Sequence, residues 1–362
     1  MRRQWGAVIT VQWGAVGIAV AVLAIAIAVV ASSGSSANPQ IAYVAAGPSS
    51  EPEVWVAGDG GASARRLGPG SAPLIAPDGS MVAASSVAGE SALTLYRAST
   101  PSGSSESAHR FFSAARTTAR ARAWSPDSRY LAVVLSSTDP ASDAGSGLAV
   151  IDARTDTYRI IAHGPIEGAG FAPGVSDRIV YGAAASTALS APVNIHIATA
   201  SGTDRTQITH DGRSLNPVWG PGGIAFDHEW LRRSAAPAYE IFSMRADGSA
   251  RRALTDLAPS ALMDGLVPLA FSADGARLLA EYEGQDTSQA WTITIASQLA
   301  RELLLGGHSV AGAGISRDGG TVLVDRGGFL YPPGHGVVQS LSFTGGRARV
   351  LIAHGSQPSW TL

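Results

Sequence analysis

The chain has 362 residues, of which 45% are apolar and only 15% are charged. This apolar fraction excludes an intrinsically disordered chain, and the lack of cysteine excludes a disulfide framework, a thiolate metal site and a cysteine nucleophile. The formal net charge of −2 gives no electrostatic reason to expect a nucleic-acid partner. Frequent glycine and proline, with few charges, favour an all-β chain with many short turns.

An apolar segment near the N-terminus is long enough to cross a membrane. Residues 14–31 carry no polar side chain. With the mostly apolar residues before them they would span roughly 33 Å as a helix, enough for a bilayer core of about 30 Å. Arg2 and Arg3 precede this segment, so the positive-inside rule puts the N-terminus in the cytoplasm. We therefore expect an uncleaved signal anchor, a transmembrane helix, within residues 1–31.

This anchor would place the rest of the chain outside the cytoplasm. The Ser-rich residues 32–40 then form a flexible tether, and residues 41–362 form one exported domain. The alternative is a signal peptide whose small-residue cleavage site ends at Ala31 or Ala37, which would release the domain as a secreted protein.

One sequence pattern recurs throughout the exported part. It consists of an aromatic residue or Ile, a turn rich in Pro, Asp and Gly, and a short β-branched run, as in AWSPDSRYLAVVL (123–135). We call its first position the anchor residue. The anchor residues lie 44 to 52 residues apart, and they are Ile75, Trp124, Phe171, Trp219, Phe271, Ile315 and Trp360.

A second pattern lies between the anchor residues. Segments such as EVWVAGDGGASARRL (53–67) and EIFSMRADGSARRALT (240–255) alternate apolar and polar residues and turn at glycine. Alternation broken by such a turn predicts a β-hairpin, because glycine accepts the positive φ of a tight turn. Each repeat therefore supplies four antiparallel strands, which is typical of a β-propeller blade.

The strand count predicts seven blades, with six as the runner-up. Second strands are expected to start near seven positions, namely Ile41, Met81, Tyr130, Arg178, Gly223, Arg277 and Thr321. The first of these has no innermost strand before it, and the last anchor has no strand after it. We therefore expect residues 356–361 to complete the first blade and close the ring, which removes exposed strand edges.

These repeats resemble a known family. The Pro-Asp-Gly turn after an aromatic residue, the apolar strand and the late Asp-Gly-x-x-x-Arg hairpin look like the TolB-type propeller repeat, over about residues 41–362. TolB proteins carry an α/β domain ahead of a six-bladed periplasmic propeller, whereas here a predicted membrane anchor precedes the repeats. The resemblance implies a propeller that binds proteins in the cell envelope.

Residues with potential for chemistry are few and have structural interpretations. The aspartates of the recurring turn could suggest calcium, but they lack the D-x-D-x-D spacing of a calcium loop, so we interpret them as turn residues. Four histidines precede anchors at comparable points and could ring a metal, although bonds to neighbouring loops are the simpler interpretation. The aspartates are Asp78, Asp127, Asp274 and Asp318, and the histidines are His163, His210, His308 and His354. We expect no catalytic residue, metal or cofactor.

Two loops that follow second strands are rich in residues common at protein interfaces. The predicted partner-binding residues are, in the first loop, His228, Glu229, Trp230, Arg232 and Arg233, and in the second, Phe329 and Tyr331. The alternative is that these loops fold onto their own blades and bury the aromatic side chains.

The sequence thus favours a non-enzymatic, membrane-tethered β-propeller outside the cytoplasm. It would be a monomer that acts as an interaction scaffold or sensor for protein partners in the cell envelope. The alternative is a propeller enzyme or glycan-binding module that uses the central channel, and it requires convergent carboxylates or a metal at the channel mouth.

Overall fold

The computed structural model describes these residues: 40–86, 92–99, 108–112, 117–139, 141–175, 177–188, 191–230, 238–257, 263–284, 287–327 and 334–361. The expected anchor (1–31) and nearly all of the expected tether lie outside the described residues, so both stay predictions. Within the described part of the chain, no helix is long and apolar enough to span a bilayer.

The described residues form β-strands almost throughout, with one short 3-10 turn, η1 (Asp59–Gly61). Four-stranded antiparallel sheets repeat along the chain, as in propeller blades. Written from the innermost strand outward, the first four are: blade 1, β30 (Ser356–Trp360), β1 (Gln40–Ala46), β2 (Pro52–Gly58), β3 (Arg65–Pro69); blade 2, β4 (Ser71–Ile75), β5 (Met81–Ser85), β6 (Leu93–Arg97), β7 (Ala108–Phe111); blade 3, β8 (Thr117–Trp124), β9 (Tyr130–Ser137), β10 (Gly147–Asp152), β11 (Thr157–His163); blade 4, β12 (Ile166–Phe171), β13 (Arg178–Ala184), β14 (Val193–Thr199), β15 (Thr206–Gln207).

Three further four-stranded groups complete the described part of the ring. They are: blade 5, β16 (Ser214–Gly220), β17 (Gly223–Trp230), β18 (Ala238–Met244), β19 (Arg252–Ala253); blade 6, β20 (Met263–Phe271), β21 (Arg277–Gly284), β22 (Thr287–Thr294), β23 (Leu299–Glu302); blade 7, β26 (Ala311–Ile315), β27 (Thr321–Arg326), β28 (Val337–Ser342), β29 (Arg349–Ile352). A small hairpin, β24 (Leu304–Leu305) and β25 (His308–Ser309), joins blades 6 and 7 and was not predicted.

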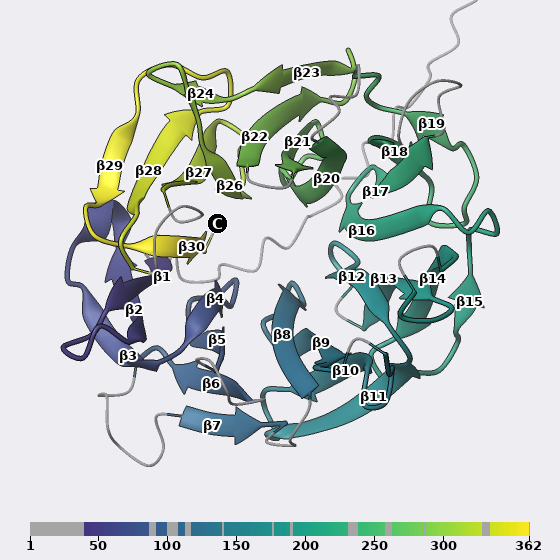
Figure 1. The fold of residues 1–362 in the computed structure, drawn as a ribbon, viewed down its shortest axis with the longest axis horizontal. Helices are drawn as coiled ribbons and strands as arrows, with labels where there is room; N and C mark the ends of the chain where they lie inside the picture. Colours follow the sequence, from purple (N-terminus) through teal and green to yellow (C-terminus); the bar gives the residue numbers. More distant parts are fainter. Residues whose placement is uncertain are drawn as a thin grey trace, which may run out of the picture. The chain divides into compact units, whose positions relative to one another are not determined.

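The blades follow one another around a ring (Figure 1). Their innermost strands contact in a closed cycle, in the order β30, β4, β8, β12, β16, β20, β26 and back to β30. The C-terminal strand β30 pairs antiparallel with β1, with Trp360 opposite Ile41. The expectation that the C-terminal residues complete the first blade is therefore confirmed.

The apolar core lies between successive blades. Along β17, Ile224 packs with residues of blade 4, whereas its neighbour Ala225 packs with Leu266 and Leu278 of blade 6. This alternation follows from the strand geometry, which points successive side chains to opposite faces of the sheet. Each second strand thus shows one face to the preceding blade and the other to the next.

The turns between first and second strands are built as the turn interpretation predicts. In blade 7, the Ser316 hydroxyl donates to Asp318 Oδ1 (2.5 Å) and accepts from the Thr321 amide (2.8 Å). Asp318 Oδ1 also accepts from the Gly320 amide. The same serine–aspartate pairing occurs at Ser125–Asp127 and Ser272–Asp274. These aspartates therefore serve the local backbone.

Candidate functional site

Three successive blades carry a carboxylate at one equivalent place. Asp227, Glu281 and Asp325 are each the fifth residue of the second strand of their blade. In blades 1 to 4 this place is held by residues without an acidic side chain: Val44, Ser85, Val134 and Gly182. We call it the fifth position. An acidic side chain at this position is therefore confined to blades 5, 6 and 7.

Side chains at the fifth position face the innermost strand of the next blade. The Ser85 hydroxyl in blade 2 donates to the Ala119 carbonyl of β8 (2.9 Å). Asp325 Oδ2 in blade 7 accepts from the Gln357 amide of β30 (2.7 Å). Because the innermost strands line the centre of the ring, the fifth position brings a side chain close to the central channel.

Asp227 is buried and only half satisfied. Its exposed fraction is 3%, and its Oδ2 accepts from the Asn216 side-chain amide at 3.2 Å. Its Oδ1 is buried with no hydrogen-bond partner among the described residues. Burial raises the pKa of Asp227 to about 7, and repulsion from the carboxylates of Glu167 and Glu283 adds to this effect.

Glu281, one blade further on, is half-buried and shifted in the same direction. Burial raises its pKa to about 7, with repulsion from Glu283 and Asp325 acting the same way. Attraction to Arg120 opposes these effects. Blades 5 and 6 therefore each carry a carboxyl group that exchanges its proton near neutral pH, which is typical of functional sites but also occurs in structural networks.

Two arginines of blade 3 interact electrostatically with carboxylates of this region: Arg120 with Glu281, and Arg122 with Glu167 and Glu283. Arg122 occupies a β-bulge of β8, where the pairing register shifts between Ala121 and Ala123, and a bulge re-aims its side chain. Burial and the neighbouring Arg120 lower the pKa of Arg122, while Glu167 and Glu283 raise it. The Arg122 side chain nevertheless remains exposed to solvent.

These electrostatic contacts connect opposite sides of the ring. Blade 3 supplies Arg122, and blade 6 supplies Glu283, which interacts with it. Side chains from blades that are not neighbours can approach each other in the central channel. We name the group the channel charge cluster, and its members are Arg120, Arg122, Glu167, Asp227, Glu281, Glu283 and Asp325.

The channel charge cluster contains more acids than bases. It has five carboxyl groups and two guanidinium groups, so it has an excess of three negative charges when every group is ionised. Carboxylates that lie close together, and above all a buried one such as Asp227, either keep protons or attract a cation. Within the described residues, no group of three His, Asp or Glu side chains is arranged to hold a metal ion.

The junction of blades 5 and 6 beside this cluster is unusually tight. Gly265 of β20 pairs in parallel with Tyr239 of β18, which joins the two blades into one sheet. Gly265 has a φ of +136°, and a Cβ atom there would lie 2.4 Å from the Tyr239 carbonyl oxygen. Only glycine fits this approach. The same glycine pairs with Glu283 of β21, so the tight junction fixes the strand that carries this carboxylate.

The predicted partner-binding residues are only partly described. His228 packs inward against its own blade: its Nδ1 donates to the Arg213 carbonyl at 2.8 Å, and its ring lies 4.8 Å from that of Phe242. Burial lowers the pKa of His228. Glu229 is partly exposed, and Trp230 ends β17. The remaining predicted residues lie outside the described residues, namely Arg232, Arg233, Phe329 and Tyr331.

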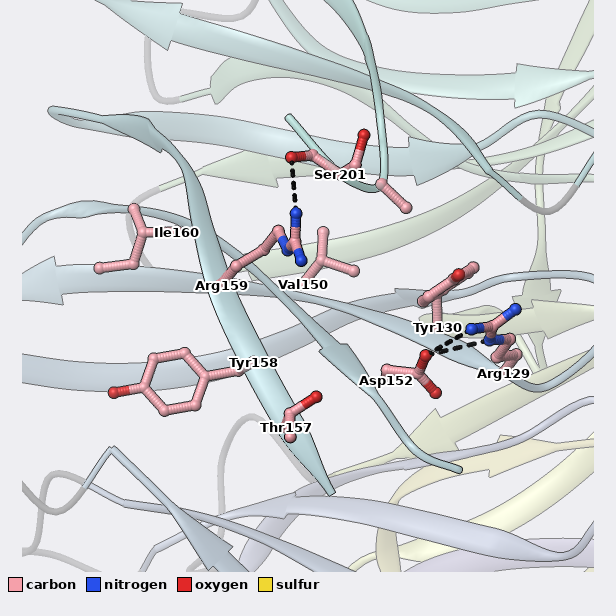
Figure 2. Close-up of a pocket in the computed structure, with 10 residues that line it drawn as sticks. Arg129, Tyr130, Val150, Asp152, Thr157, Tyr158, Arg159, Ile160 and Ser201 are labelled. Atoms are coloured by element: carbon pink, nitrogen blue, oxygen red, sulfur yellow. Dashed lines mark hydrogen bonds and ion pairs between the residues drawn. The ribbon is translucent and has the colours of Figure 1, made fainter. Parts of the chain in front are cut away.

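A separate pocket of about 550 Å³ lies between blades 3 and 4 (Figure 2). Its charged groups already have protein partners. Arg129 donates twice to Asp152 Oδ2, at 3.0 and 2.7 Å, and Arg159 donates to the Ser201 carbonyl at 3.2 Å. The charged groups of this pocket are therefore paired within the protein, whereas the channel charge cluster contains a buried oxygen, Asp227 Oδ1, without a partner among the described residues.

The comparisons with known proteins support the fold. No protein-family model matches the chain, and no curated protein matches its sequence. The chain is similar to TolB from Acinetobacter baumannii, with a TM-score of 0.53 and 15% identity, over 89% of this chain and 66% of that one. It is also similar to a prolyl endopeptidase, with a TM-score of 0.57 and 12% identity, over 86% of this chain and 47% of that one.

A third similarity covers nearly the whole of the other chain. The β-propeller domain of the Trilobed protease from Pyrococcus furiosus matches with a TM-score of 0.61 and 13% identity, over 88% of this chain and 95% of that domain. That domain is described as having an open velcro topology, whereas here β30 pairs with β1. The chain therefore shares its fold with TolB-like and protease-associated propellers. It spans just under two thirds of the TolB chain and about half of the prolyl endopeptidase.

Proposed function

We propose that this chain is a non-enzymatic, membrane-tethered β-propeller of seven blades that binds a protein partner outside the cytoplasm. The observation that carries the proposal is the convergence of unneutralised charge in the central channel, at the end where the second strands finish. Several blades contribute to it, through β8, β12, β17, β21 and β27. The predicted partner-binding residues lie at the end of β17 (His228, Glu229 and Trp230) or in the segments that follow β17 and β27.

The tether and the location come from the sequence. The apolar residues 14–31 and the preceding Arg2 and Arg3 support an uncleaved anchor with a cytoplasmic N-terminus. The similarity to TolB supports a place in the cell envelope by analogy of fold. A monomer is proposed because pairing of β30 with β1 closes the ring, so that the channel needs no second copy.

The test is capture of partners from the membranes of the native host by the tagged full-length chain. Trp230→Ala should lower recovery of the specific partner at least about fivefold, because aromatic anchors contribute much of the binding energy at interfaces. The matched control is Leu299→Ala, which removes an exposed side chain on the outer strand of blade 6. Equal recovery by both variants would contradict this placement of the binding face.

A catalytic or glycan-binding channel is the second candidate. It is favoured by the two carboxyl groups whose pKa is raised to about 7, Asp227 and Glu281, since a general acid or base works best near the ambient pH. Glycan arrays and hydrolase or lyase assays on the full-length chain test it. Turnover that is lost in Asp227→Asn and in Glu281→Gln would replace the scaffold proposal.

A further inference from the structure

The channel charge cluster has excess negative charge and one buried carboxylate oxygen without a hydrogen-bond donor among the described residues, and these features indicate a class of ligand. We propose that Asp227, with Glu167 and Glu283, forms a receptor for a single cationic group of the partner, the guanidinium or ammonium of an arginine or lysine side chain, inserted at the channel end of blade 5. This inference rests on the proposed function, because the cationic group belongs to a protein partner.

The first argument is the unused acceptor on Asp227. Oδ1 is buried and lacks a hydrogen-bond partner among the described residues, while Oδ2 is held by Asn216 at 3.2 Å. Leaving a buried acceptor unpaired costs stability. Asp227 is thus held by one amide through Oδ2, while Oδ1 keeps an unused acceptor that a donor from a partner could satisfy.

The second argument is the comparison with the equivalent carboxylate in blade 7. Asp325 lies at the same fifth position, but its Oδ2 accepts from the Gln357 amide of the closing strand at 2.7 Å. In blade 7 the residue at the fifth position thus accepts a backbone hydrogen bond that holds the closing strand. In blade 5 Asp227 accepts from a side-chain amide of its own blade, and its second oxygen faces no donor in the described part of β20.

The third argument concerns charge and access. The groups that act on Asp227 are the carboxylates of Glu167 on β12 and Glu283 on β21, and both disfavour its ionised form. Arg122 on β8 is attracted electrostatically to both of these neighbours. Glu283 is exposed and Glu167 is partly exposed, whereas Asp227 is buried, so a cation would have to reach Asp227 from the side of these two glutamates. A cation that enters there would neutralise repulsion that the two arginines leave uncompensated.

Guanidinium and ammonium fit this site better than a metal ion. They bring several N–H donors with the charge, and guanidinium can bridge two carboxylates. The described residues hold no group of three side chains arranged for a metal. A loop that carries one arginine could reach the channel end without displacing the innermost strands.

The probe is the capped tripeptide Arg-Arg-Arg, titrated calorimetrically into the full-length chain at pH 8, with capped Gln-Gln-Gln as the neutral control. Asp227→Asn should weaken binding about tenfold or more, because it removes a hydrogen-bonded charge. Asp247→Asn is the matched control, since it removes the same charge from an exposed turn of the same blade. It should change affinity less than twofold.

Proton release gives an independent readout. At pH 7 a cation that binds beside Asp227 should displace its proton, so about half a proton per peptide should be released, and almost none at pH 9. Titrations in buffers of different ionisation enthalpy measure this number. Glu283→Gln, at an exposed position, keeps the test open if Asp227→Asn folds poorly, and it should weaken binding too.

The outcomes separate the two proposals. Equal affinity of wild type, Asp227→Asn and Glu283→Gln for the arginine peptide, with no proton released at pH 7, overturns the cationic receptor. If Trp230→Ala still loses the membrane partner in that case, the proposed binding function stands. If the arginine peptide binds as expected but no variant affects partner capture, the proposed function fails instead.

Discussion

Carboxylates at the two ends of the second strands have pKa values that are shifted in opposite directions. Asp274 and Glu281 lie seven residues apart around β21. A serine hydroxyl and backbone amides hydrogen-bond to Asp274 and lower its pKa, whereas burial and neighbouring carboxylates raise the pKa of Glu281 to about 7. At one end of blade 6 the carboxylate thus stabilises the turn, whereas at the other end the environment disfavours the ionised carboxylate.

Blade 7 differs, because its carboxylates form structural hydrogen bonds at both ends of the strand. Asp318 at the turn end has its pKa lowered by Ser316 and the Gly320 amide. Seven residues on, Asp325 is buried and accepts from the Gln357 amide of the closing strand. The channel-end position is therefore not reserved for binding. Its role depends on the hydrogen-bond donors of the next blade, and in blade 5 one oxygen of Asp227 has no donor among the described residues.

Removal of the closing strand should have the largest effect, because it disrupts blade 1 and the contact that Asp325 makes at the channel end. Deletion of residues 356–362 takes the pairing partner from β1 and the donor from Asp325. Loss of a whole strand and exposure of two sheet edges should cost more than about 5 kcal/mol and cause aggregation. Size-exclusion chromatography and chemical denaturation measure this, and addition of a synthetic 353–362 peptide should restore a monomer. A monomeric truncation of unchanged stability would disprove closure by β30.

Asp227→Asn should give the next largest effect, and one that depends on pH. The unfolded chain releases this proton near pH 3.8, whereas the folded chain keeps it to about pH 7. Folded protein therefore binds the extra proton between these values, and its stability falls as pH rises through that window and is constant above it. Asparagine does not titrate and so lacks this loss. The free energy of unfolding of the variant, compared with that of wild type, should therefore rise by on the order of 3–4 kcal/mol when the pH is raised from 4 to 8.

Urea denaturation at the two pH values measures this gain. The matched control is Asp247→Asn in the exposed turn of the same blade. Its pKa is lowered rather than raised, so its contribution to stability is present above about pH 4 and is lost as pH falls below that value. A similar pH profile for both variants would remove the difference between the two ends.

Asp325→Ala should lower the free energy of unfolding by a smaller amount, through the loss of one hydrogen bond. It leaves the Gln357 amide at the blade 7–blade 1 junction without its acceptor, which should cost about 2 kcal/mol. Asp325→Asn keeps an acceptor oxygen and should recover most of the loss. Denaturation at pH 8 tests both variants. Equal losses for alanine and asparagine would show that charge, and not the hydrogen bond, matters at this position.

Ser316→Ala should have the smallest effect. Its hydroxyl accepts from the Thr321 amide and donates to Asp318, so its loss should cost about 1 kcal/mol. Thermal unfolding at pH 7 measures the shift, and the variant should bind the arginine peptide as wild type does. Weakened peptide binding in this variant would mean that the turn end and the channel end are coupled.

The repeat pattern was sufficient to predict the strands. The predicted starts at Met81, Tyr130 and Arg178 coincide with those of β5, β9 and β13, and the closing strand falls where it was expected. Turn chemistry and period-2 alternation are local signals, so they can be read from one chain. The small hairpin β24–β25 has a turn signal in Gly306 and Gly307, both of positive φ, but strands of two residues are too short to show alternation.

The candidate site was harder to predict. Asp227 lies 8 residues after its anchor, whereas Glu281 and Asp325 lie 10 residues after theirs, because the turn of blade 5 is shorter. This offset hides their equivalence in the sequence. The predicted loop covered residues 227–238, but only His228 and later residues were expected to bind a partner. Residues 227–230 belong to β17 instead, where alternation puts Asp227 on the opposite face from His228. The electrostatic interaction between blades 3 and 6 depends on how the blades are arranged across the ring, which no local pattern encodes.

Direct titration of the aspartates tests the contrast between the two ends most closely. Carboxyl-carbon NMR on the full-length chain labelled at aspartate follows each group with pH, and Asp227→Asn and Asp318→Asn assign the two decisive signals. We predict one aspartate signal with a midpoint near pH 7 that disappears in Asp227→Asn, and a signal with a midpoint below 3.8 that disappears in Asp318→Asn. A midpoint below about pH 5 for Asp227 would contradict the account.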